Sequence, residues 1–262
     1  MGGSSHKNRN VGILCCCLVL TACLPDVPSL PLSSEPTSLT ETPTLTLTST
    51  PLWFPPTATF TPFPTDEMTP TPDQRPALGE IILSDDFSTG EGWSLGRTNA
   101  ASLAIGLDEL TIAIAAPRAY AYSLRPQPLL SDFYAEITAS PMLCRGADEY
   151  GLLFRFASPT DFYRFGVSCE GQVSLDRVLK GKVSSPQPWI SSGAVLPGAP
   201  NTARLGVWVV GKEMRFFAND LYLFTVNDST IPAGALCVFA RAAGDLAVTV
   251  NFSQLIVREV ER

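Results

Sequence analysis

Histidine is almost absent from this sequence of 262 residues. Its single histidine, His6, lies in an N-terminal segment that we expect to be cleaved, so the mature chain would contain none. Histidine is the commonest general base near neutral pH and the commonest metal ligand. Its absence argues against Ser-His-Asp and Cys-His hydrolysis and against histidine-based zinc or iron sites. Any chemistry would therefore have to rest on carboxylates, Tyr, Lys or Arg, and we expect no metal and no cofactor.

Clusters of basic residues are also missing. The formal net charge is -7, and the 18 Lys and Arg residues are scattered along the chain. A nucleic-acid-binding protein gathers such residues into a patch or stripe that neutralises phosphates. The sequence therefore predicts no nucleic-acid partner, and nothing in it indicates more than a monomer.

Residues 1–22 have the organisation of a secretory signal peptide. Lys7 and Arg9 precede an apolar run from Val11 to Leu20, which is shorter than the roughly 20 residues that a permanent membrane span requires. The sequence Leu20-Thr21-Ala22-Cys23 then resembles the bacterial lipobox. This resemblance implies cleavage before Cys23 and attachment of diacylglyceryl to its thiol, which would anchor an extracytoplasmic protein to the bacterial cell membrane. The alternative is an ordinary secretory peptide with an incidental cysteine.

Residues 23–79 form a segment rich in threonine and proline. Between Leu24 and Gly79 there are 13 Pro and 13 Thr among 56 residues. Proline removes backbone donors and holds φ near the polyproline II value, so this segment cannot form a packed core. We expect a disordered, extended stalk between Cys23 and a globular domain.

Residues 80–262 are predicted to form one all-β domain. Short runs of alternating apolar residues are separated by turn residues, and no stretch has sustained helical periodicity. Four of these runs place apolar residues on one face: Leu110, Ile112 and Ile114; Tyr150, Leu152, Phe154 and Phe156; Tyr163, Phe165, Val167 and Cys169; and Val248, Val250 and Phe252. Glu170-Gly171, Gly211-Lys212 and Asn219-Asp220 lie between runs at hairpin spacing. About a dozen strands of this kind favour two antiparallel sheets packed face to face.

Several short motifs resemble those of the concanavalin A-like lectin/glucanase jelly roll. More narrowly, they are similar to the laminin-G-like and 3-keto-disaccharide-hydrolase-like domains of bacterial lipoproteins. The motifs are Asp85-Asp86-Phe87-Ser88, Gly92-Trp93, Tyr150-Gly151-Leu152-Leu153-Phe154-Arg155, Phe162-Tyr163-Arg164-Phe165, Arg215-Phe216-Phe217-Ala218-Asn219 and Val250-Asn251-Phe252-Ser253. The resemblance implies a two-sheet antiparallel jelly-roll sandwich. Where the family often has an acidic residue after the phenylalanine of its closing strand, this chain has Ser253 and Gln254, which argues against a calcium site.

Three cysteines lie in the predicted domain. Cys144 and Cys169 end runs that enter the same side of the inferred meander, and export permits oxidation, so a disulfide between them is our preferred prediction. Cys237 would then be a buried free thiol. The rival pairing of Cys169 with Cys237 cannot be rejected from spacing alone.

Alternation also predicts a polar ligand face. If Phe154 and Phe165 point inward, then Arg155 and Arg164 point outward on neighbouring strands, and the same alternation adds Asp176, Arg204 and Arg215. Trp189, in a predicted loop after Pro186-Gln187-Pro188, is the tryptophan that we expect to contact a ligand. The alternative is that these charged residues only solvate a sheet face.

Paired acids suited to hydrolysis are not apparent. A glycosidase of this fold carries acids at Glu-x-Asp-x-x-Glu spacing on one strand, and no such motif occurs. Asp85-Asp86 and Asp148-Glu149 are adjacent pairs, which point to opposite faces of a strand, and we predict no catalytic residue. The sequence thus favours a non-catalytic recognition module for a polysaccharide or cell-wall glycan. The alternatives are a carboxylate-dependent glycoside hydrolase or lyase of the keto-disaccharide type, and a structural envelope protein that binds other proteins.

Overall fold

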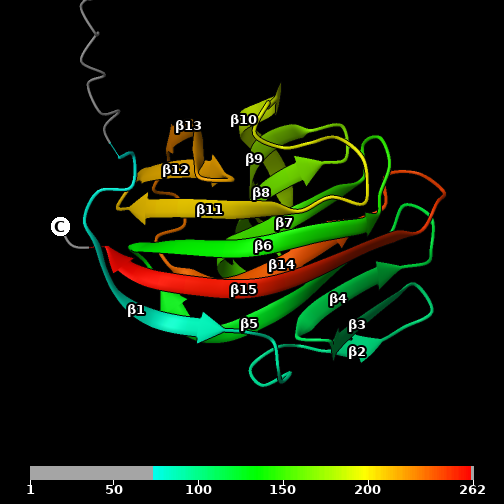
Figure 1. The fold of residues 1–262 in the computed structure, drawn as a ribbon. Coiled ribbons are helices and arrows are strands. Elements are labelled where there is room, and N and C mark those ends of the chain that lie inside the picture. Colours follow the sequence, from blue (N-terminus) through cyan, green and yellow to red (C-terminus); the bar gives the residue numbers. More distant parts are fainter. Residues whose placement is uncertain (1–72, 261–262) are drawn as a thin grey trace, which may run out of the picture. The chain divides into compact units, whose positions relative to one another are not determined.

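The computed structural model describes residues 73–260, which form two antiparallel β-sheets packed face to face (Figure 1). This confirms the predicted all-β jelly-roll sandwich. Within residues 73–260 there is no helix, and therefore none long and apolar enough to cross a membrane. The predicted signal peptide, Cys23 and the stalk up to residue 72 lie outside the described residues.

The larger sheet has nine strands and the smaller has six. The nine-stranded sheet has the order β13 (Leu221–Asn227), β12 (Glu213–Ala218), β11 (Ala203–Val210), β6 (Phe133–Leu143), β15 (Val248–Val260), β4 (Glu109–Ile114), β3 (Ala101–Gly106) and β2 (Gly96–Arg97), and β1 (Leu78–Asp85) also pairs with β15. The six-stranded sheet has the order β10 (Lys182–Ser191), β9 (Gln172–Leu179), β8 (Asp161–Ser168), β7 (Glu149–Ser158), β14 (Gly234–Arg241) and β5 (Tyr120–Leu130).

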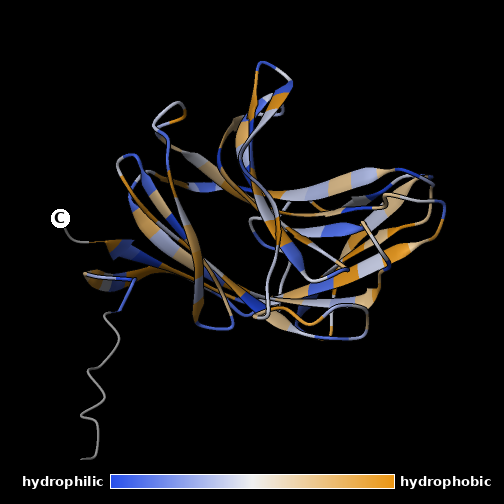
Figure 2. Cartoon of the chain, turned by 90° about the horizontal axis from the view of Figure 1, so that it is seen from above, coloured by the Kyte–Doolittle hydropathy of each residue, from blue (hydrophilic) through white to orange (hydrophobic). Residues whose placement is uncertain are grey.

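The core lies between the two sheets and follows the predicted alternation. Figure 2 shows hydrophobic and hydrophilic bands alternating along the strands. The apolar faces predicted for β4, β8 and β15 are all buried in this core. The three predicted hairpin turns are also present, and Gly171, Gly211, Asn219 and Asp220 have positive φ values there of 76°, 56°, 50° and 64°. Glycine and asparagine tolerate this conformation better than other residues, so local chemistry and the hydrophobic pattern agree.

A β-bulge interrupts the alternation of β7. Arg155 has a φ of 46°, and the pairing of β7 with both of its neighbours shifts at this point. Because the bulge adds one residue, Arg155 turns into the interior and Phe156 turns to the opposite face from Phe154. The prediction that Phe156 shares the core face of Phe154 is therefore wrong.

The first strand begins at Leu78, two residues before the predicted domain boundary, and the residues just before it already contact the domain. Arg75 donates a hydrogen bond of 3.0 Å to Asp220 and lies over the rings of Tyr134 and Phe217. Trp208 donates from Nε1 to the carbonyl oxygen of Pro76 at 3.1 Å. The end of the predicted stalk is therefore fastened to the nine-stranded sheet.

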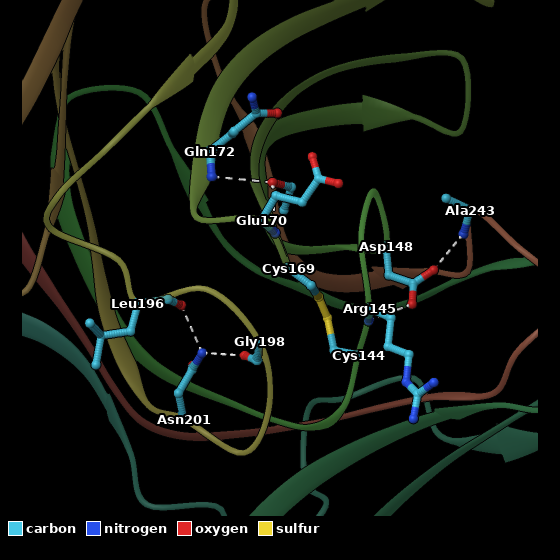
Figure 3. The surroundings of a disulfide bond; sticks show 11 residues. Cys144, Arg145, Asp148, Cys169, Glu170, Gln172, Leu196, Gly198, Asn201 and Ala243 are labelled. Atoms are coloured by element: carbon cyan, nitrogen blue, oxygen red, sulfur yellow. Dashed lines mark hydrogen bonds between the residues drawn. A yellow bond between two sulfur atoms is a disulfide. The ribbon is translucent and has the colours of Figure 1, made fainter.

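A disulfide joins Cys144, which follows β6 in the nine-stranded sheet, to Cys169, which follows β8 in the six-stranded sheet (Figure 3). Beside it, the buried carboxylate of Asp148 accepts hydrogen bonds from the backbone N–H groups of Arg145 and Ala243, at 2.9 and 2.8 Å. Cys237 is a free cysteine with no exposed surface. The disulfide thus connects the two layers covalently.

Candidate ligand-binding face

The candidate site lies on the face of the six-stranded sheet that points away from the core. Strand pairing arranges its central residues in three rows that cross the sheet. The polar row is Tyr120, Arg241, Glu149 and Ser168; the glycine row is Tyr122, Phe239, Gly151, Gly166 and Ser174; and the arginine row is Leu124, Cys237, Leu153, Arg164 and Asp176. These three rows, with Trp189 and Ser185 of β10, are called the outer-face site below.

The glycine row leaves the middle of this face without two side chains. Gly151 has a φ of 151°, and a Cβ there would lie 2.2 Å from the carbonyl oxygen of Phe165, so no other residue fits. Gly166 lies opposite Gly151 on β8. The space that side chains would fill at these two positions is taken by neighbouring aromatic rings, Phe239 beside Gly151 and Trp189 beside Gly166, and both glycines are buried.

Trp189 lies against this glycine floor. A Cβ added to Gly166 would lie 3.1 Å from Cη2 of the Trp189 indole, which places the ring at the outer surface of the sheet. The side chain is 37% exposed. Trp189 belongs to β10 and not to a loop as predicted. Pro186 and Pro188 have no backbone N–H to donate, but β10 is an edge strand whose pairing with β9 is irregular, so the strand tolerates both prolines. A half-exposed indole that packs over Gly166 suits stacking against a flat ligand.

Arg164 and Asp176 form an ion pair in the arginine row. Ser185 donates a hydrogen bond of 2.5 Å to the other carboxylate oxygen of Asp176. The guanidinium of Arg164 also lies 6.0 Å from the ring centre of Phe239 on β14. The pair is therefore contacted from two further strands, by Ser185 of β10 and Phe239 of β14.

Glu149 and Arg241 form a second ion pair in the polar row. Glu149 is only 4% exposed, and burial raises the pKa of its carboxyl, whereas the charges of Arg164 and Arg241 oppose this shift. Tyr120, which is 38% exposed, packs its ring 5.7 Å from that of Phe239. The polar row thus combines a buried carboxylate with exposed groups at its rim.

The outer-face site contains three of the six residues predicted for the ligand face, namely Arg164, Asp176 and Trp189. The placement of Arg155 on that face was wrong. It is 1% exposed and donates to the carbonyl oxygens of Ile231, Ser131 and Gly211 at 3.2, 2.8 and 2.8 Å. The bulge turns it inward, where it fixes three loops.

Arg215 lies on the other sheet, so it cannot join the same site. Its guanidinium stacks on the indole of Trp208 at 4.6 Å and donates to the carbonyl oxygen of Gln74 at 2.8 Å. Arg204, whose side chain is 46% exposed, is also on that sheet and pairs with Asp220. Alternation predicts whether a residue faces outward, but it does not predict to which of two sheets its strand belongs.

Sequence reasoning did not predict Glu149, Arg241 or Tyr120 as members of the site. In the sequence Glu149 stands in an adjacent acidic pair, but its phase with Gly151 and Leu153 along β7 indicates the outer face. Its neighbour Asp148 serves the turn, as expected for a strand-end acid. Arg241 and Tyr120 are brought to Glu149 by strands far away in sequence, so no local pattern predicts the group.

Asp85 and Asp86, the other adjacent acidic pair, have structural partners. Asp85 accepts hydrogen bonds from the backbone of Phe87 and from Trp93 Nε1, both at 2.9 Å, and pairs with Arg125 at 2.6 Å. Asp86 accepts from the backbone N–H of Ser88 at 3.0 Å. In the described part of the chain, no group of three or more His, Cys, Asp or Glu side chains is arranged to hold a metal ion.

The two sheets and their connections define a jelly-roll sandwich of the galectin-like and concanavalin A-like kind. Among solved structures, the chain is similar to the carbohydrate-binding module CBM66 from Bacillus subtilis, with a TM-score of 0.53 and 16% identity over 64% of this chain and 96% of that one. It is also similar to a protein of unknown function with a galectin-like fold from Bacillus subtilis, with a TM-score of 0.54 and 12% identity over 71% and 99% of the two chains. A third similar structure is the catalytic domain of an endo-1,3-beta-glucanase (laminarinase) from Thermotoga petrophila RKU-1, with a TM-score of 0.51 and 9% identity over 70% of this chain and 98% of that one.

These likenesses establish the fold alone, because all three identities are low. No protein-family model and no curated protein sequence matches the chain. The function must therefore be argued from the residues of the outer-face site.

Proposed function

We propose that the β-sandwich is a carbohydrate-recognition module that is held at the outer side of a bacterial cell membrane through lipidated Cys23. The composition of the outer-face site is the observation that supports carbohydrate recognition. Trp189 offers an aromatic face to the C–H surface of a sugar ring, and two Arg–carboxylate pairs offer donors and acceptors to its hydroxyls. Solved neighbours named as a carbohydrate-binding module and as a glucanase support this choice of ligand.

The two ion pairs favour recognition over hydrolysis. A general acid must hold a proton before it reaches the glycosidic oxygen. Here Glu149 and Asp176 are instead each engaged by an arginine of this chain, Arg241 and Arg164. Carboxylates held in this way are suited to accept hydrogen bonds from a ligand.

Replacing Trp189 by Ala should weaken glycan binding by at least about tenfold, because truncating a tryptophan in a recognition site removes one of its largest contacts. The full chain, purified in detergent, would be screened on a glycan array and on isolated cell wall, beside the W189A and R164A variants. Tyr222→Ala is the matched control, because Tyr222 is an exposed aromatic residue on the other sheet. Failure of the unmodified chain to bind any glycan or wall fraction would refute the proposal.

Replacing Cys23 by Ala should release the protein from the membrane fraction, because no thiol would remain at the lipobox to carry the diacylglyceryl group. Cell fractionation and metabolic labelling with a fatty acid provide the measurement. Cys16→Ala is the control, since Cys16 lies within the apolar run and we expect it to stay unmodified. A C23A protein that remains membrane-bound and labelled would show that Cys23 is not the anchor.

A further inference from the structure

Within the described residues, the outer-face site holds one buried polar atom without a partner, Oε2 of Glu149. The other oxygen of this carboxylate, Oε1, pairs with Arg241, and the residue is 4% exposed. Oε2 makes no hydrogen bond and has almost no exposed surface. Leaving a charged acceptor buried and unpaired is costly, so such an atom indicates a donor that is supplied from outside the chain.

The charged groups of the site are already balanced. In its three rows the two acids, Glu149 and Asp176, are paired with the two arginines, Arg241 and Arg164. Both guanidinium groups thus face a carboxylate of this chain. An anionic sugar would have to compete for these arginines and would approach two carboxylates of its own sign.

We infer that this site selects neutral glycans, with a ligand hydroxyl donating its hydrogen bond to Oε2 of Glu149. This inference rests on the proposed function. A hydroxyl satisfies the unpaired oxygen and adds no charge to a balanced site. A uronate carboxylate offers only acceptors at neutral pH, so it leaves Oε2 unpaired and adds repulsion. The specificity thus follows from the one buried polar atom of this site that the described part of the chain leaves without a hydrogen bond.

A pair of ligands that differ only in charge tests the inference on the unmodified protein. Glucan and mannan oligosaccharides would be compared with the same oligosaccharides oxidised at C6 to uronates, by titration calorimetry of the full chain in detergent. We expect each neutral parent that binds to do so at least about tenfold more tightly than its oxidised form. Equal or tighter binding of the uronates would overturn the inference.

The variant Glu149→Gln tests the role of the carboxylate. It preserves the size of the side chain but replaces a charged acceptor by an amide, so we expect binding of the neutral glycan to weaken by about tenfold. Glu170→Gln is the matched control, because Glu170 is an exposed acid in the turn next to β9. Circular dichroism and the unfolding midpoint check that each variant is folded.

The outcomes separate the two proposals. Wild-type binding of neutral glycans that survives in a folded E149Q variant overturns the inference and leaves carbohydrate recognition intact. Absence of binding to any neutral or oxidised glycan by the wild-type chain refutes carbohydrate recognition, and the inference falls with it. Should E149Q not fold, the wild-type comparison of parent and oxidised glycans alone decides.

Discussion

Replacing Arg155 by Met is expected to lower the free energy of unfolding by about 4 kcal/mol. The guanidinium is buried at the β7 bulge, and it is the shared donor for the carbonyl oxygens of Ser131, Gly211 and Ile231. Methionine retains most of the volume of the side chain but leaves all three carbonyl groups without this donor. Urea unfolding of the variant, followed by tryptophan fluorescence, measures the loss.

Arg118→Met is the matched control for this prediction. Its side chain is 78% exposed, and its nearest acid, Asp245, is 3.9 Å away and equally exposed. Surface pairs of this kind contribute little, so the control should change stability by less than about 0.5 kcal/mol. A loss below about 1 kcal/mol for R155M would contradict the view that this arginine holds the three loops together.

Removing the disulfide is expected to cost about 3 kcal/mol. Cys144 and Cys169 are 25 residues apart in sequence, and the bond restricts the unfolded chain by closing that loop. The measurement is the shift in unfolding free energy of a C144A/C169A double variant. Addition of a reductant should lower the stability of the wild-type protein by a similar amount and should leave the double variant unchanged. Equal sensitivity of both proteins to the reductant would contradict this account.

The fold could be predicted from the sequence because its signals are local. A strand alternates with period two, and a hairpin turn needs residues that tolerate positive φ, so Val248 to Phe252 and Asn219-Asp220 indicate their own structure. The β7 bulge is different. Nothing in Phe154-Arg155-Phe156 indicates it, because the bulge depends on carbonyl groups of three distant loops that together accept a buried guanidinium.

The candidate site could be predicted only in part, because some of its residues come from strands that are distant in the sequence. Arg164 and Asp176 lie on consecutive strands, so their hairpin brings them together. Glu149 and Arg241 are 92 residues apart in sequence and meet only because β7 and β14 are paired in the sheet. Such non-local strand pairing, which also put Arg215 on the opposite sheet, is set by the packing of the whole domain.

The contacts of residues 73–77 have a mechanical consequence. Tension applied to the domain through the preceding chain would load the hydrogen bonds of Arg75 and of the Pro76 carbonyl first. Only then would it load the first residue pair between β1 and β15, Leu78 and Val260. Asp220, Trp208 and Arg215 spread that load over β11, β12 and the turn after β12. The terminal strand β1, which pairs only with β15, is thereby protected from being peeled away one hydrogen bond at a time.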